Sequence, residues 1–285
     1  MSRPMECFID SARTPSQRRL AALMNEWRAL GDRRAHFCAG YVMATDTVMA
    51  TARAGRFLDS AWVLRLLDEW AEYYLITVEP NGDDLTLVTP PAWADSHGAA
   101  ALPTTTAAEA LVLGVNAHVN NDLPQALCAL LSDEWPVTAR SLDRRRTDFD
   151  KLVSVLAETM DGVQTLVTRF DAKLLRSAPA SCLDSLTIWD VNRLCDSWRG
   201  GVWADSLALL TAADATWATA IREAIECSAT RRAHLLMCKL EARETLVLLP
   251  GSALDQAFPH RHDTVQCRLR RTPPVWGDRV ATSAT

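Results

Sequence analysis

The chain has 285 residues, of which 48% are hydrophobic and 23% charged, and its formal net charge is −5. This composition is typical of a globular protein with a substantial buried core. The acidic balance argues against nucleic acid as a partner, and no apolar stretch has the length of a membrane span. Because the first residues also lack an apolar leader, we expect a cytoplasmic protein with no membrane partner.

The first 80 residues predict three helices. Apolar residues recur at three- and four-residue spacing over residues 16–31, 32–55 and 59–76, which is the period of an amphipathic helix. Gly31 and Gly55 follow two of these runs, and Asp59 precedes the third as a candidate N-cap.

The next stretch, residues 80–104, carries Pro, Gly and Asp throughout and predicts a long loop. Loops of this length inside a domain often cover a functional site. Helical patterns return after a cap at Thr105 or Thr106. They continue over residues 123–131, 142–176, 183–212 and 214–249.

No strand pattern and no Gly-rich phosphate loop interrupt these helical runs. We therefore expect an all-α protein, a single multi-helix bundle domain over residues 1–250 with one long loop at about 80–104. Past Pro250 the sequence is rich in Pro, Arg, His and Thr without apolar periodicity. Residues 251–285 are expected to form an irregular or disordered C-terminal tail.

The segment GVNAHVNNDLPQAL, residues 114–127, places an unusual density of polar residues between two apolar helical runs. In a continuous helix His118 and Asp122 share one face, because they are four residues apart. Such a pair could act as a base whose tautomer the carboxylate fixes, or could hold a divalent metal. Asn116 and Asn121 would position substrate oxygens or close the interrupted helix.

A purely structural interpretation of this segment stays open. Asp122 and Gln125 have the spacing of a capping box, which would make Asp122 the start of a new helix. The alternative is a continuous helix, kinked where Pro124 conflicts with the carbonyl of the residue four positions earlier.

Two further sets of residues are candidates for substrate binding. Arg199 and Trp203 are four residues apart in an otherwise apolar helix, where the guanidinium could hold an anionic group beside an aromatic wall. Asp148 shares a stripe with Leu152 and Val155, which would turn its carboxylate inward. A snorkelling arginine and a helix-start aspartate are the corresponding structural explanations.

LGVNAHVNNDLPQAL resembles the N-A-H-I-N-x-D-L-P-like signature of an uncharacterised bacterial family, the domain-of-unknown-function family 5995. RGGVWADSLAL is similar to its R-x-x-x-W-x-x-A-x-x-L segment, although Ser206 replaces alanine, and the loop at 80–104 is longer here. The resemblance covers most of residues 30–215 and implies a helical fold without naming a reaction. It singles out these positions as the site: Asn116, His118, Asp122, Arg199 and Trp203.

These observations favour an enzyme that acts on a small organic molecule, of isomerase, cyclase or hydrolase type, in bacterial specialised metabolism. His118 and Asp122 would be its catalytic residues or the ligands of a metal. The alternative is a non-catalytic helical protein that binds a small molecule or serves as a scaffold.

Overall fold

The fold is described from a computed structural model, which covers residues 13–78, 89–103, 105–134, 142–159, 162–163 and 188–237. Every regular element in these ranges is a helix, which confirms the predicted all-α class. The elements are α2 (Pro15–Leu30), α3 (Ala35–Arg53), α4 (Ser60–Val78), α5 (Pro91–Ala101), α6 (Ala107–Ala117), the π-helix η1 (His118–Asp122), α7 (Leu123–Asp133), α8 (Leu142–Glu158), α10 (Ile188–Leu210) and α11 (Ala215–Met237).

Local sequence signals set several helix starts. Asp59 caps α4 by accepting the Trp62 N–H at 3.0 Å, as the sequence predicted. Of the two predicted caps of α6, Thr106 is the one that is used, and it forms a reciprocal capping box with Glu109. Each cap provides an acceptor for backbone N–H groups that have no partner within the helix.

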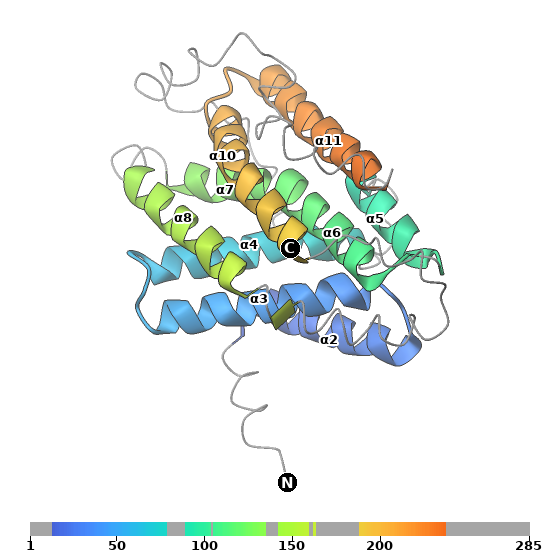
Figure 1. Ribbon diagram of the computed structural model, residues 1–285. Coiled ribbons are helices and arrows are strands. Elements are labelled where there is room, and N and C mark those ends of the chain that lie inside the picture. The colour runs from blue at the N-terminus through green and yellow to red at the C-terminus, as the bar shows by residue number, and fades with distance from the viewer. Residues whose placement is uncertain are drawn as a thin grey trace, which may run out of the picture.

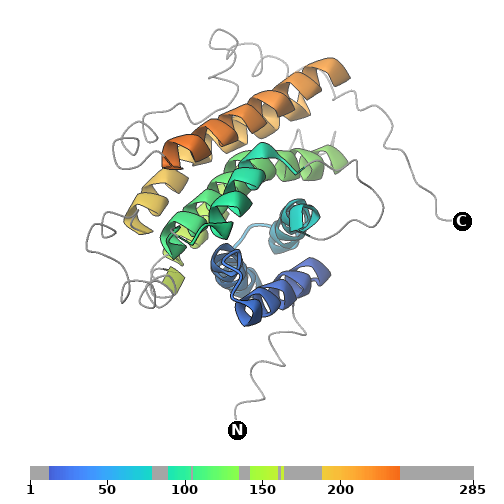
Figure 2. The same ribbon diagram turned by 90° about the vertical axis from the view of Figure 1, so that its right-hand side faces the viewer.

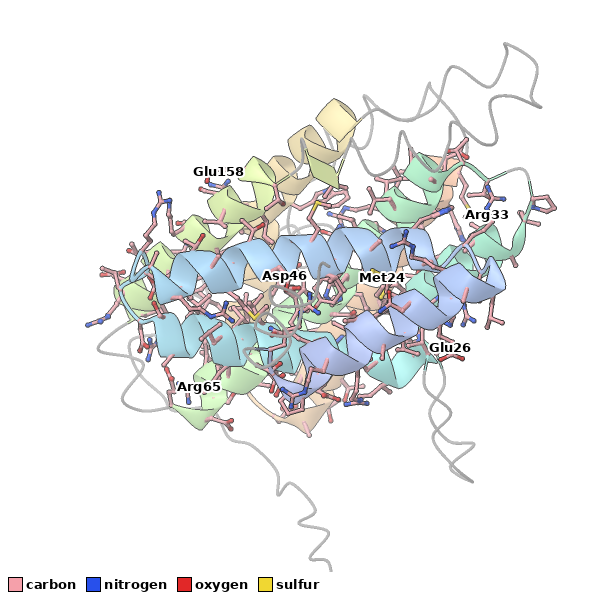
Figure 3. All side chains as sticks on the ribbon, turned by 90° about the horizontal axis from the view of Figure 1, so that it is seen from below. Met24, Glu26, Arg33, Asp46, Arg65 and Glu158 are labelled. Carbon is pink, nitrogen blue, oxygen red and sulfur yellow. The ribbon has the colours of Figure 1, made fainter. Side chains whose placement is uncertain are left out.

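The helices are arranged around one long central element made of α6, η1 and α7 (Figures 1 and 2). Helices α3 and α4 pack against it from one side, and α10 and α11 pack against it from the other. Seen from the α2–α4 side, exposed charged side chains such as Glu26, Arg65 and Glu158 lie at the outside of the molecule (Figure 3). The central element is therefore enclosed by helices that are far apart in the sequence.

The predicted loop at 80–104 is shorter than the sequence indicated, because residues 91–101 form helix α5. Pro91 occupies the first turn of this helix, where a missing N–H costs no hydrogen bond. The alanines of the segment are good helix formers. The buried face of α5 includes Trp93, so the second half of the predicted loop is part of the core.

The structure tests the other predicted helix boundaries only within the described residues. Helix α8 ends at Glu158, and the rest of the helix predicted over 142–176 lies outside the described residues apart from 162–163. The predicted tail, residues 251–285, also lies outside them. Among the described helices, none is both long and apolar enough to cross a membrane.

Candidate functional site

The polar motif folds as a π turn within a continuous helix. The Leu123 N–H donates to the carbonyl of His118, five residues earlier, which is the bond pattern of a π-helix. Pro124 follows directly, and a π turn is one way in which a helix passes a residue that has no N–H. Asp122 makes no capping hydrogen bond, so the structure favours the continuous helix over a new helix start.

Asp122 is the most heavily hydrogen-bonded side chain of this turn. Its Oδ2 accepts from His118 Nδ1 at 3.0 Å and from Trp93 Nε1 at 2.9 Å. Its Oδ1 accepts from Asn121 Nδ2 at 2.9 Å. The indole N–H of Trp93 and the amide NH₂ of Asn121 can only donate, so Asp122 is the acceptor in both of these bonds. The pairing of His118 with Asp122 predicted from their spacing is confirmed.

Aromatic rings enclose the imidazole of His118. The Trp70 ring stacks on it at 4.1 Å with an interplanar angle of 5°, and Trp70 Nε1 donates to the His118 carbonyl at 2.9 Å. Tyr41 and Phe37 approach edge-on, with centroids 4.4 Å and 5.8 Å from the imidazole. The ring is therefore held in one orientation by α3 and α4 as well as by Asp122.

Burial opposes the protonation of His118. Only 2% of the residue is exposed, and this desolvation lowers its pKa below the usual value, against the opposing hydrogen bond and charge of Asp122. A neutral imidazole carries one N–H, and the contact with the carboxylate places it on Nδ1. Nε2 is left as an acceptor, and it has no hydrogen-bond partner in the described part of the chain.

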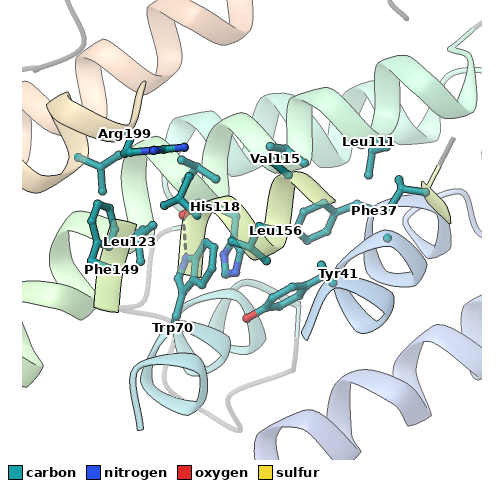
Figure 4. Close-up of a pocket in the computed structure, with 17 residues that line it drawn as sticks. Phe37, Tyr41, Trp70, Leu111, Val115, His118, Leu123, Phe149, Leu156 and Arg199 are labelled. Carbon is teal, nitrogen blue, oxygen red and sulfur yellow. Dashed lines mark hydrogen bonds between the residues drawn. The ribbon is translucent and has the colours of Figure 1, made fainter. Parts of the chain in front are cut away.

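His118 lines a cavity of about 100 Å³ between α3, α6, α8 and α10 (Figure 4). The other lining residues are mostly aliphatic or aromatic, and they include Phe37, Leu111 and Phe149. Arg199 lines the same cavity from α10, so the structure brings together His118 and Arg199, which are 81 positions apart in the sequence.

The segments that form this site lie within the range matched by a family model. The model of a family of unknown function, DUF5995, matches residues 17–239, which is more than half of the chain. The chain belongs to the DUF5995 family. No curated protein and no solved structure matches it significantly.

The asparagines of the motif are hydrogen-bonded to other protein groups. Asn116 Nδ2 donates to the carbonyl of Ala229 in α11 at 2.9 Å, and Asn120 Nδ2 donates to Asn116 Oδ1 at 3.1 Å. Asn121 supports Asp122, as described above. Neither Asn116 nor Asn121 lines the cavity. The Asn116 side chain thus joins α6 to α11 and the Asn121 side chain supports Asp122, while a backbone carbonyl of the turn is bonded by Gln125 Nε2 at 2.9 Å.

Two other predicted substrate-binding residues are not among those that line the cavity. Trp203 packs against Phe149, with ring centroids 5.3 Å apart. The guanidinium of Arg146 lies over the Trp203 ring, 5.2 Å from its centroid. Asp148 is turned inward, as predicted, but its oxygens accept the backbone N–H groups of Leu58 at 2.7 Å and Asp59 at 2.8 Å. Asp148 thus anchors the start of α4, where a negative charge is favourable.

The donor set of the motif does not fit a metal centre. Both oxygens of Asp122 and the Nδ1 of His118 are engaged with each other or with N–H groups, and a metal would have to displace these donors. In the ranges that the structure describes, no group of three His, Cys, Asp or Glu residues is placed to hold an ion. A tetrahedral site usually takes at least three such ligands.

Three aromatic residues around His118 were not identified as site residues from the sequence. Tyr41, Trp70 and Trp93 come from α3, α4 and α5, and each of them contacts the His118–Asp122 pair. Aromatic rings spaced four apart, as in Phe37–Tyr41, were the one available signal. Such spacing is also ordinary for core packing, so it could not single these residues out.

Proposed function

We propose that this protein is an acid–base enzyme acting on a small, largely apolar organic molecule, with His118 as the general base and Asp122 as the residue that orients it. One observation carries the proposal: His118 is buried, its Nδ1 is fixed on a carboxylate, and its Nε2 lacks a partner while the residue lines a cavity. A base of this kind must be neutral and held in one tautomer to accept a proton.

A structural role alone accounts poorly for this arrangement. Buried polar atoms in folded proteins nearly always have a hydrogen-bond partner. Leaving one without a partner costs about 1–3 kcal/mol. The Asp122 side of His118 is satisfied by the fold, whereas the Nε2 side is not.

The cavity wall favours a substrate with a compact apolar body. Its volume of about 100 Å³ is somewhat below that of an engineered cavity of about 150 Å³ that takes up benzene. Ser, Thr and Cys are missing from the described lining residues, so the geometry supports direct proton transfer rather than a covalent intermediate.

We place this activity in the cytoplasm, with a small molecule rather than nucleic acid as the partner. Cys38 and Cys128 are buried free thiols, which is the form expected in a reducing compartment. The arginines of α8 support the second point, since Arg145 and Arg146 pair with Asp59, Glu134 and Asp150 and do not form an unopposed basic patch.

The experiment is a comparison of three purified proteins on a small-molecule extract of the source cells, followed by untargeted mass spectrometry. His118→Gln removes the base, and His36→Gln is a matched control because His36 lies outside the cavity wall. We expect the wild type and His36→Gln to convert the same compound and His118→Gln to leave it unchanged. A compound that is retained by the protein but recovered unchanged would show a binding protein instead, and conversion by His118→Gln would refute the proposal.

A further inference from the structure

Trp70 holds His118 at two points (Figure 4). Its indole Nε1 donates to the backbone carbonyl of His118 at 2.9 Å, and the same carbonyl accepts the Leu123 N–H that closes the π turn. The indole ring also lies flat on the imidazole, with centroids 4.1 Å apart and an angle of 5° between the two planes. Only 3% of Trp70 is exposed, so water does not compete with either contact.

The sequence places Trp70 on the inward face of α4. Trp62, Leu66 and Trp70 are spaced by four residues, and all three are buried. This face meets the central element, because α4 packs against η1 and α7. A leucine could fill the same position in the core. Tryptophan adds a large flat π face and an N–H donor, and both of these features are used on His118.

The flat stack suits a charged imidazole better than a neutral one. The face of an aromatic ring carries partial negative charge, and it attracts a cation that lies within about 6 Å of its centroid, most strongly in Trp. An imidazolium is a planar cation, and the separation of 4.1 Å is well inside this range. A neutral imidazole gains only ordinary stacking, so the contact favours the protonated ring.

The other groups around the imidazole leave this task to Trp70 and Asp122. The titratable or charged side chains that face the ring or line its cavity are Asp122 on its own turn, Tyr41 from α3, Tyr74 from α4 and Arg199 from α10. Burial raises the pKa of both tyrosines well above the usual value, so they stay neutral. Arg199 has the same charge as an imidazolium and opposes it.

We propose that Trp70 is a positioning residue for His118, which fixes the orientation of the imidazole and stabilises the positive charge that the ring acquires when it takes up a proton. This inference rests on the proposed function, in which His118 is the base. Burial disfavours that charge. A contact that strengthens as the charge develops lowers the barrier, whereas one that is equally strong in both states does not. Asp122 acts at the Nδ1 edge of the ring, and Trp70 acts at its face.

The test is a pH titration of the His118 imidazole by nitrogen-15 NMR in the wild type, Trp70→Phe and Trp70→Leu. Phenylalanine keeps a weaker face, and leucine has none. We expect the pKa of His118 to fall in that order, with about a tenfold loss of proton affinity in Trp70→Leu. Trp62→Phe is the matched control: Trp62 is a buried tryptophan of the same helix, but its ring lies under the guanidinium of Arg145, at 5.1 Å. This variant should titrate like the wild type.

The direction of the change separates this role from simple packing. Looser packing would admit water and raise the pKa of His118 toward 6.5, so a fall cannot come from a loosened core. A pKa in Trp70→Phe or Trp70→Leu equal to or above that of the wild type would overturn the inference. So would a wild-type ring that takes up no proton before the protein unfolds in acid. Melting curves at each pH limit the comparison to folded protein, and Trp70→Phe decides alone if Trp70→Leu does not fold.

The titration uses no substrate, so it can fail independently of the proposed function. If the pKa order is absent but the extract experiment shows conversion that depends on His118, the base role stands and Trp70 only packs against the ring. If the pKa order is found but no compound is converted, the contact stabilises an imidazolium as inferred, and the proposed reaction is wrong.

Discussion

Replacing Asp122 by asparagine should destabilise the fold far more than the loss of an ordinary ion pair. The carboxylate accepts from His118 Nδ1, Trp93 Nε1 and Asn121 Nδ2 at 2.9–3.2 Å. An asparagine presents an NH₂ group in place of one oxygen. Whichever way the amide turns, its NH₂ group faces side chains that donate hydrogen bonds to Asp122 in the wild type.

The size of the effect follows from these contacts. A hydrogen bond to a charged group contributes about 1.5–3 kcal/mol, and a buried donor left without an acceptor costs about 1–3 kcal/mol. Because Asp122 and His118 are only 2% and 3% exposed at their side chains, water cannot replace the lost acceptor. We expect Asp122→Asn to lower the free energy of unfolding by about 3–5 kcal/mol, as for other broken buried pairs. Loss of a helix cap would cost only about 0.5–2 kcal/mol.

The assay is urea unfolding of the wild type, Asp122→Asn and a matched control. Arg146–Asp150 is also a pair with a spacing of four, but its side chains are 34% and 38% exposed. Asp150→Asn should therefore cost less than about 1 kcal/mol. If Asp122→Asn costs no more than Asp150→Asn, the hydrogen-bond network around Asp122 does not stabilise the protein.

Two other predictions concern acid stability and packing. Burial lowers the pKa of His36 and of His97 from 6.5 to about 4, so the unfolded chain binds more protons between these values, and stability should fall as the pH falls from about 6.5 to about 4. Urea titrations across this range should show a smaller fall for His97→Gln, and an unchanged fall would contradict the assignment. Gly114→Ala places a Cβ 2.4 Å from Phe37 Cδ2, whereas Gly98→Ala meets nothing within 4 Å. We expect a loss of about 1–3 kcal/mol for the first and a slight gain for the second, and equal melting temperatures would show that Phe37 is not packed on Gly114.

The features that the sequence predicted correctly are local ones. Helix α4 follows from a capping aspartate and from apolar residues at helical spacing, and the pairing of His118 with Asp122 follows from a separation of four. Both depend on residues within one or two turns of each other. Even the π turn was partly foreseeable, because Pro124 cannot continue a regular ladder of hydrogen bonds.

The features that were missed depend on packing between distant segments. Trp93 lies in a stretch whose Pro, Gly and Asp content predicted a loop, yet it provides an N–H for Asp122. Asp148 was a candidate for substrate binding, and only the fold shows that it accepts the N–H groups of Leu58 and Asp59. The proximity of Tyr41 to His118 likewise arises from the packing of α3 against the central element.

The most direct test of the account is the protonation state of His118, measured by nitrogen-15 NMR of the imidazole with His118→Gln used for assignment. We predict a neutral ring at pH 7 with its proton on Nδ1, since burial lowers the pKa of His118 from 6.5. Asp122→Asn should change this tautomer preference, since the carboxylate that fixes it is gone. An imidazolium at pH 7, or a neutral ring with its proton on Nε2, would leave no free base at the cavity and would contradict the proposal.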